Sequence, residues 1–246
     1  MIRVLGSGSS GNAVLIGDVN PVLLDAGLPI KRLRAALRGY GVTTLTKLAF
    51  AAITHEHQDH AQAVEGLLKA SVDVLASEGT LKALGVEGHH RAVALTPSVV
   101  TQVNGWGIIA IPVKHDAAEP VAFYVGKNGL RVLYVTDTEG FAPPAGLVSR
   151  PTHVLIEANH RRSELEHLSE FDQTALRSSN NHLSIEAAME ALAQLDLSAC
   201  REIRLLHISD RFGDEEGFVS EVAAEFGVPV YAAPREMRWT HDPSND

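Results

Sequence analysis

The sequence predicts an α/β (α+β) fold in which two mixed β-sheets pack face to face, with helices on their outer sides. Three observations predict this class. Short apolar strand candidates follow one another early in the chain, strands alternate with helices in both halves, and residues of metal-ligand type follow several apolar runs directly. Meandering strands combined with strand–helix alternation are typical of mixed sheets covered by helices.

The chain of 246 residues is long enough for one large domain or two small ones. No low-complexity run, block of like charge or Pro/Ser-rich bridge resembles a linker, so we expect a single domain over residues 1–238 and a polar tail over 239–246. No apolar run approaches the length of a membrane span. We therefore expect a cytoplasmic protein with no membrane partner, and a homo-oligomer is compatible with the sequence.

The formal net charge of −9 and the single cysteine restrict the function further. A sequence-independent nucleic-acid binder usually carries a basic surface, so extensive contact with phosphate backbones requires a local cluster of basic residues. Cys200 alone can form neither an internal disulfide nor a cysteine-based zinc cluster. Histidine, present 12 times, is therefore the only soft metal ligand available in number.

The first elements lead to a glycine-rich loop and a helix. Strands are predicted over residues 2–5, 14–16 and 22–24. Residues 6–12 allow tight turns, and because no lysine follows them as in a phosphate-binding P-loop, we interpret them as a structural turn near the site. Pro29 then opens a helix with Ile30, Leu33 and Leu37 on one face.

The remaining elements alternate strands with helices. Further strands are predicted at residues 48–53, 72–76, 93–95, 99–103, 108–113, 121–125, 130–135, 154–156, 203–206 and 228–231. Helices are predicted over residues 61–70, 77–84, 184–195 and about 214–226. Ser77 and Ser184 stand where helix N-caps are expected.

The stretch Ile53-Thr54-His55-Glu56-His57-Gln58-Asp59-His60 joins a predicted strand to a predicted helix. Extended backbone would place His55 and His57 on the same side, two residues apart. Asp59 and His60 then lie on the turn into the helix and direct a second pair of ligands into the same space. The stretch can thus supply two adjacent metal ions with two ligands each. The alternative is a polar surface loop that is rich in histidine.

Three later strands also end at a residue of ligand type: His115, Asp137 and His207. If the sheets share an edge, these residues gather there with the first motif. Each of them alone could be a buried polar residue with an ordinary partner. Their common position at strand ends favours one shared site.

The H-x-H-x-D-H motif, followed by the three later strand ends, resembles the ligand set of the metallo-β-lactamase superfamily. The resemblance implies an αββα sandwich and two divalent metal ions, zinc or manganese, with iron as a further candidate. Asp25, in Leu24-Asp25-Ala26-Gly27, would orient a ligand histidine. The resemblance assigns one ion to His55, His57 and His115 and the other to Asp59, His60 and His207, with Asp137 bridging the two.

Residues 181–188 resemble the histidine motif of the phosphodiesterase branch of that superfamily, which includes the tRNA 3′-processing nuclease RNase Z. In that branch the histidine at the position of His182 contacts the scissile phosphate and protonates the leaving oxygen. The alternative is that His182 is only a neighbour of the helix cap Ser184. We assign His182, together with Asp59, to catalysis.

Over residues 1–235 the chain resembles the YycJ/WalJ group of bacterial metallo-β-lactamase proteins, which is linked to 5′-to-3′ exonuclease activity on DNA. Thr54-His55-Glu56-His57 and Glu157-Ala158-Asn159-His160 are among the shared motifs. The chain departs from the group where Arg161-Arg162 follows His160, and where Asn181 replaces the glycine expected before His182. The long insertion with which RNase Z grips tRNA has no evident counterpart, so tRNA processing is not expected.

Several residues beside the ligand set are candidates for contacting substrate or supporting the ligands. Glu157 and His160 follow a strand and would form a supporting pair or contact substrate, or else be ordinary strand-end residues. The best local basic patch would hold a phosphate or consist of solvated loop charges. This set comprises Asp25, Glu157, His160, Arg161 and Ser184, and the basic patch comprises Arg161, Arg162 and Arg177.

We therefore expect a phosphodiester hydrolase, with DNA as substrate, in which metal-bound hydroxide attacks phosphorus in line and His182 assists the leaving group. One alternative is hydrolysis of a cyclic nucleotide or another small phosphodiester, which the acidic net charge favours. A second is thioester or lactone hydrolysis, against which the His182 motif argues. A third is a metal-binding sensor without activity.

Overall fold

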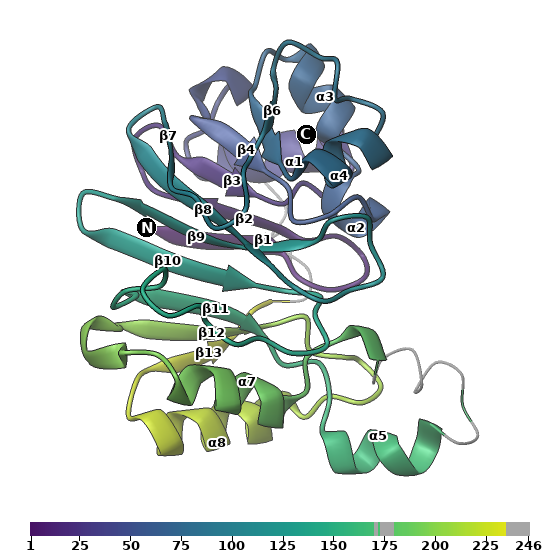
Figure 1. Cartoon of the computed structure of the whole chain (residues 1–246), viewed down its shortest axis with the longest axis vertical. Helices are drawn as coiled ribbons and strands as arrows, with labels where there is room; N and C mark the ends of the chain where they lie inside the picture. Colours follow the sequence, from purple (N-terminus) through teal and green to yellow (C-terminus); the bar gives the residue numbers. More distant parts are fainter. Residues whose placement is uncertain (170–171, 173–179, 235–246) are drawn as a thin grey trace, which may run out of the picture.

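Two β-sheets form the centre of the computed structural model, which describes residues 1–169, 172 and 180–234 (Figure 1). Within these residues the first sheet has the strand order β1-β2-β3-β4-β5-β6, and the second has the order β13-β12-β11-β10-β9-β8-β7. Strands β1 to β3 are antiparallel and β3 to β6 parallel, whereas β7 to β10 are antiparallel and β10 to β13 parallel. The prediction of two mixed sheets is confirmed.

The strands are mostly short, as the apolar runs predict. The first sheet contains β1 (Ile2–Gly6), β2 (Ala13–Ile16), β3 (Val22–Leu24), β4 (Phe50–Ala52), β5 (Val74–Ala76) and β6 (Ala92–Ala94). The second contains β7 (Thr101–Val103), β8 (Trp106–Pro112), β9 (Val121–Lys127), β10 (Leu130–Val135), β11 (His153–Glu157), β12 (Glu202–Leu206) and β13 (Val230–Ala232).

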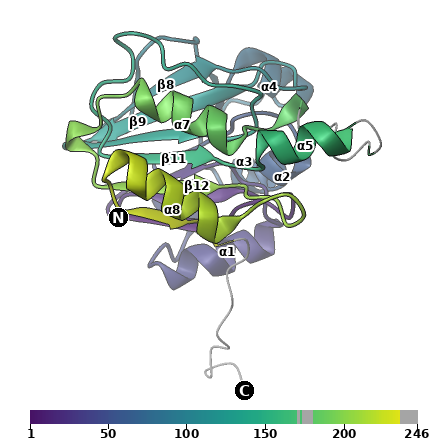
Figure 2. The ribbon, with the colours of Figure 1, turned by 90° about the horizontal axis from the view of Figure 1, so that it is seen from below.

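Helices lie on the outer side of each sheet, as Figures 1 and 2 show. On the first sheet they are α1 (Ile30–Gly39), α2 (Gln58–Ala61), α3 (Val64–Lys69) and α4 (Glu78–Ala83). With the second sheet lie α5 (Arg162–Ser169), α7 (Ile185–Ala193) and α8 (Glu215–Phe226). Two single 3₁₀ turns, η1 (Leu45–Lys47) and η2 (Leu197–Ala199), complete the described elements.

The alternation of side chains along each strand produces the layers. In β2, Ala13 and Leu15 pack with Leu33 and Leu37 of α1, while Val14 and Ile16 point into the space between the sheets. Both faces of the strand are therefore buried, which explains why its sequence is a continuous apolar run rather than an alternating one. A third apolar cluster joins the second sheet to α7 and α8.

The helix predicted over residues 61–70 is divided into α2 and α3. The backbone N–H of Ala63 donates to the carbonyl of Ala26 at 2.8 Å, a bond outside the helix. This bond and the turn at Ala63, with φ −92° and ψ 1°, end the regular helical pattern. The break leaves Asp59 and His60 on a separate short helix beside Ala26.

The N-termini of two other helices are capped by the serines predicted from the sequence. Ser77 and Ser184 cap α4 and α7 by accepting from the backbone N–H three residues on. Helix α5 was not predicted, since its sequence is dominated by polar residues.

The tail predicted over residues 239–246, with the domain boundary at 238, lies outside the described residues. In the described part of the chain, no helix is long and apolar enough to cross a lipid bilayer.

Gly27 permits a close contact between three segments of backbone. A Cβ at this position would lie 1.6 Å from the carbonyl oxygen of Asp59 and 2.8 Å from the nitrogen of Asn12. The same backbone atoms are already joined, because Asn12 N–H donates to the Asp59 carbonyl at 2.7 Å. The absence of a side chain at Gly27 therefore fixes where the motif residues Asp59 and His60 stand.

We expect Gly27→Ala to lower the free energy of unfolding by about 3 kcal/mol, because backbone rather than a flexible side chain must move. Thermal or urea denaturation of the variant would measure this loss. The matched control is Gly39→Ala at the end of α1, where an added Cβ meets nothing within 4 Å. Equal stability of both variants would contradict the packing argument.

Candidate metal centre

The polar residues predicted at strand ends lie together at one edge of the two sheets. Asp25 follows β3, Asp137 follows β10 and His207 follows β12, and each has a left-handed backbone with φ of 56°, 47° and 50°. This conformation is rare for residues other than glycine and concentrates at functional sites. It turns the chain sharply as each strand stops.

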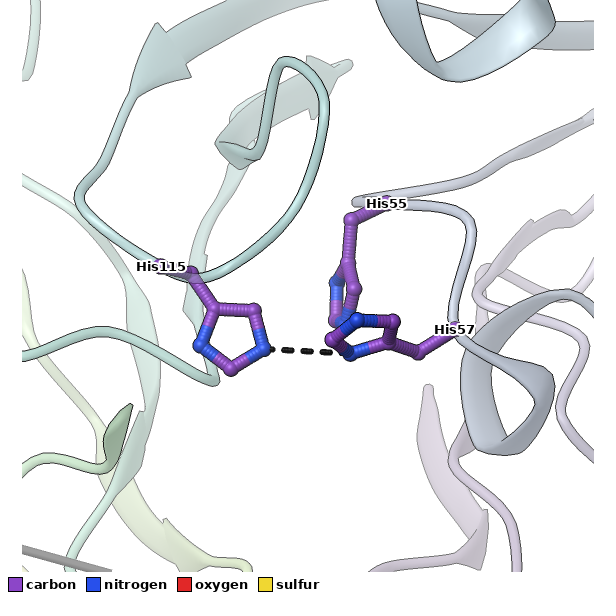
Figure 3. Close-up of side chains that lie close together, drawn as sticks. All are labelled: His55, His57 and His115. Carbon is purple, nitrogen blue, oxygen red and sulfur yellow. Dashed lines mark hydrogen bonds between the residues drawn. The ribbon is translucent and has the colours of Figure 1, made fainter. Parts of the chain in front are cut away.

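His55, His57 and His115 form the first cluster, shown in Figure 3. Nε2 of His115 lies 3.2 Å from Nδ1 of His57, and the His55 ring lies 4.6 Å and 4.8 Å from the other two by ring centroids. His55 and His57 come from the turn between β4 and α2, and His115 from the end of β8. The three residues predicted for one metal ion are thus brought together.

Asp137 lies between this cluster and the residues of the second. Its Oδ2 is 3.2 Å from Nε2 of His60 and 3.9 Å from Nε2 of His55. Its Oδ1 is 3.2 Å from Nδ1 of His207. One carboxylate therefore faces histidines of both predicted ligand sets, which is the arrangement that a bridging ligand requires.

The second cluster differs in membership from the predicted set of Asp59, His60 and His207. His60 groups with His55 and Asp137, and Asp59 Oδ2 is 3.6 Å from its Nε2. His207 instead groups with Asp137 and two further side chains, Glu157 and His182. Within the described groups, His60 and His207 are thus not direct neighbours, and Asp137 connects them.

A hydrogen-bonded network holds His60 in place. Its Nδ1 donates to Oδ2 of Asp25 at 2.8 Å, and Asp25 also accepts from the Tyr134 hydroxyl at 2.8 Å and from Thr54 N–H at 2.8 Å. This is the orienting contact that the prediction for Asp25 requires. Thr54 and Tyr134 were not among the predicted site residues. A buried tyrosine in an apolar strand is a weak signal by itself.

The glycine-rich loop closes the site on another side. Asn12 places its side-chain amide 2.9 Å from Nε2 of His60, and Ser7 Oγ accepts from the backbone N–H of His207 at 2.8 Å. The Asn12 amide oxygen also accepts from Gly8 N–H at 2.8 Å. The loop is therefore a structural turn beside the predicted ligands.

Two buried imidazole nitrogens carry lone pairs directed into the first cluster. The Thr54 hydroxyl donates to Asp25 and so accepts from Nδ1 of His55 at 3.0 Å, which leaves the lone pair on Nε2. That atom is buried and has no hydrogen-bond partner among the described residues. His115 likewise donates from Nδ1 to the Asn181 carbonyl at 3.1 Å, which leaves its lone pair on Nε2.

A buried lone pair on Nε2 of His55 that no donor satisfies among the described residues fits a cation. Burial lowers the pKa of His55, and a neutral imidazole is the form that binds a divalent ion. At His60, burial is outweighed by Asp137 and Asp25, whose carboxylates raise its pKa. A cation would have to displace that proton, so metal binding and proton release are coupled at this site.

Glu157 links two histidines that are far apart in sequence. Its Oε1 accepts from Nδ1 of His182 at 2.7 Å and from Nδ1 of His207 at 2.9 Å. Burial lowers the pKa of His182, but the Glu157 carboxylate, aided by Asp137 and Asp59, outweighs it and raises that pKa to about 9. His182 is therefore held as an imidazolium with its second N–H free to donate.

The remaining predicted residues lie around this core. His160 is buried, its Nδ1 lacks a partner within the described residues, and its backbone carbonyl accepts from Ile185 at the start of α7. Ser184 caps α7. The guanidinium of Arg161 pairs with Glu221 and, at 3.8 Å, with Glu186.

The other two arginines of the predicted patch are Arg162 and Arg177. Arg162 reaches Glu190 at 3.9 Å. Arg177 lies outside the described residues.

The fold and the histidine–carboxylate cluster together define a metal-dependent hydrolase. A family model described as "Beta-lactamase superfamily domain" matches residues 20–208, and the chain belongs to that superfamily. The family predicted from the sequence is thereby confirmed.

Individual proteins extend this comparison over most of the chain. "Exodeoxyribonuclease YycJ" of Bacillus anthracis is 28% identical over 223 residues, covering 84% of this chain and 81% of that protein. The metallo-beta-lactamase fold protein YhfI from Bacillus subtilis has a TM-score of 0.73 at 18% identity, over 96% of this chain and 97% of that one. The short form of human tRNase Z has a TM-score of 0.61 at 15% identity, over 85% and 93%. The two solved structures show a common fold.

Proposed function

We propose that the protein is a phosphodiester hydrolase with two divalent metal ions, zinc or manganese, and that its substrate is DNA, degraded in the 5′-to-3′ direction. One observation carries the choice of chemistry. The imidazole of His182, protonated through its contact with Glu157, stands beside the cluster of ligand-type side chains with Nδ1 3.9 Å from Oδ1 of Asp137. A positioned proton donor next to metal ligands suits cleavage of an ester with a poor leaving group.

The donor set suggests which side chains would hold each ion. His55, His57 and His115 would hold one, because their nitrogens converge and Nε2 of His55 has no hydrogen-bond partner among the described residues. Asp59, His60 and His207 would hold the other, with Asp137 between the two. Bound divalent ions would supply Lewis acidity, which activates water and neutralises charge on the phosphoryl oxygens.

The protein's own side chains would do the remaining work. Glu157 accepts from Nδ1 of His182 and so directs the opposite N–H, on Nε2, away from the carboxylate. That N–H can protonate the leaving oxygen as the P–O bond breaks. Asp25 and Thr54 accept from Nδ1 of His60 and of His55, so that Nε2 of each ring faces the site. Nε2 of His55 carries a lone pair, and Nε2 of His60 would carry one once a cation has displaced its proton.

The choice of DNA rests on sequence rather than on geometry. The Bacillus anthracis relative is named an exodeoxyribonuclease, and its similarity spans 84% of this chain. The acidic net charge of −9 favours a second candidate, a small phosphodiester such as a cyclic nucleotide. A small substrate needs no extended contact with the protein surface.

We expect metal-depleted protein reloaded with Mn²⁺ or Zn²⁺ to shorten a 5′-labelled DNA duplex and to leave a cyclic nucleotide intact. Gel electrophoresis of the labelled strand and chromatography of the nucleotide would measure the two reactions in parallel. The His57→Ala variant is the control for a contaminating nuclease, because it removes a predicted ligand.

Each other result selects a different function. Turnover of the cyclic nucleotide alone would replace the proposal with a small-molecule phosphodiesterase. Full metal content without turnover of either substrate would favour a metal-binding sensor.

A further inference from the structure

Helix α1 carries an unusual concentration of positive charge for so acidic a protein. Between Ala26 and His55 the sequence contains five basic residues and no acidic one, although the chain has a net charge of −9. Four of the five lie on α1 and are exposed: Lys31, Arg32, Arg34 and Arg38. We call this group the α1 basic surface. It supplies the local clustering that contact with a phosphate backbone requires.

Two of these side chains line an open groove of about 390 Å³. Arg34 and Arg38, about one helical turn apart on α1, line it together with three threonines of the segment before β4, Thr43, Thr44 and Thr46. Guanidinium groups and hydroxyls are the side chains that bind phosphate oxygens in protein–DNA contacts. The groove therefore combines charge with hydrogen-bond donors.

Within the part of the chain that the structure describes, no ion pair with a carboxylate neutralises the α1 basic surface. In the described residues, neither Arg34 nor Arg38 forms an ion pair with a carboxylate. Arg161 and Arg162, by contrast, face glutamates of α7 and α8. The unpaired cations are thus on α1 and not at Arg161 and Arg162, the two described arginines of the patch that the sequence suggested.

The charge pattern does not serve the helix itself. Lys31 and Arg32 occupy its first turn, where the helix dipole favours anions and where no acidic residue is present. Arg34 and Arg38 are like charges four residues apart on one face, which repel each other. Only Arg38, in the last turn, is favourably placed for the dipole. An external anion would relieve these repulsions.

The α1 basic surface begins beside the metal centre. Asp25 contacts His60, Gly27 packs against Asp59, and α1 starts at Ile30, a few residues further on. Arg34 and Arg38 lie about 6 and 12 Å along the helix from its first residue. Helix α1 lies at the margin of the molecule, at the lower edge of Figure 2. The groove is at the other end of α1, so a strand bound there would have to run back along the helix to enter the site.

We propose that the groove between Arg34, Arg38 and the three threonines binds backbone phosphates of a nucleic-acid strand whose end enters the metal centre. This inference rests on the proposed function for the identity of the strand. It names a binding surface that is separate from the reacting groups.

The test compares Arg34→Gln/Arg38→Gln with a control that removes two exposed positive charges elsewhere, Lys82→Gln/Arg201→Gln. The metal-loaded proteins would bind a fluorescein-labelled single-stranded phosphorothioate oligonucleotide, which resists cleavage, and anisotropy would be followed over a range of salt. We expect about 20-fold weaker binding for the α1 variant near 0.1 M salt, and a salt slope smaller by about 1.4. Arg34→Lys/Arg38→Lys should retain most of the affinity.

The binding measurement tests the α1 site, and the cleavage measurement tests the proposed function. Equal affinity of the two Gln variants, or no binding by the wild-type protein, would overturn the α1 site even if DNA is cleaved. Loss of binding in the α1 variant alone would support the site even if no DNA is cleaved and the proposed function fails. Turnover of bis(p-nitrophenyl) phosphate should be the same in the α1 Gln variant and the control Gln variant, because that substrate is too small to reach the groove from the metal centre. A loss of this turnover in the α1 variant alone would contradict a role in binding only.

Discussion

The Asp137→Asn variant is expected to lose at least about 10³-fold in phosphodiesterase activity and to bind fewer than two metal ions per chain. Among the described residues, Asp137 alone is shared between the His60 group and the His207 group, at 3.2 Å from each of these histidines. Asparagine keeps the shape and tolerates the left-handed φ of 47°. Its amide nitrogen, however, offers no lone pair to a cation.

Metal content by atomic emission and turnover of a phosphodiester would be measured on the same preparation. Glu139→Gln is the matched control, since it neutralises a carboxylate two residues away that pairs with Lys114. It should change neither quantity. Two ions per chain in Asp137→Asn, with activity retained, would show that Asp137 is not a bridging ligand.

Much of the fold could be predicted because its signals are local. Apolar runs of three to seven residues gave the strands, and serine before an apolar-periodic run gave the caps of α4 and α7. The break between α2 and α3 depends instead on a bond from Ala63 to Ala26, 37 residues away. No local pattern contains that contact. Helix α5 was missed because its sequence is mostly polar, with Leu165 and Leu168 as its only large apolar residues.

The candidate site shows the same division between local and distant signals. His55 and His57 are neighbours in the sequence, and His115 shares with them a position at the end of a strand. The contact of Glu157 with both His182 and His207 joins residues 25 and 50 positions apart. The sequence paired Glu157 with His160 instead, since proximity along the chain was the only guide.

Charge was the least predictable property. The three arginines singled out near the site stood close to it in sequence, yet partners from α7 and α8 neutralise the two that the structure describes. The α1 basic surface lies early in the chain and was treated only as an amphipathic helix. The groove beside Arg34 and Arg38 is formed with residues 42–46 and Ala70, and the sequence pattern of the helix alone cannot show that these segments meet.

The His182→Ala variant should keep its metal and lose about 10³-fold in turnover of DNA. The imidazolium that Glu157 holds is expected to protonate the leaving oxygen, and alanine removes this donor without touching the predicted ligand set. A competing role exists, because His182 also belongs to the group with Asp137, Glu157 and His207 and could bind metal. Metal content separates these two roles directly: a ligand would take an ion with it, and a proton donor would not.

The leaving group provides a second, independent separation. p-Nitrophenolate is a weak base that departs without a proton, whereas the deoxyribose oxygen of DNA needs one. Loss of a proton donor should therefore slow DNA cleavage far more than cleavage of bis(p-nitrophenyl) phosphate, while loss of a metal should slow both alike. Equal losses on the two substrates with both ions in place would contradict acid catalysis. Glu157 contacts His207 as well as His182. The Glu157→Gln variant should therefore lose more activity on DNA than on bis(p-nitrophenyl) phosphate and should also bind metal more weakly, because one carboxylate supports both the proton donor and a predicted ligand.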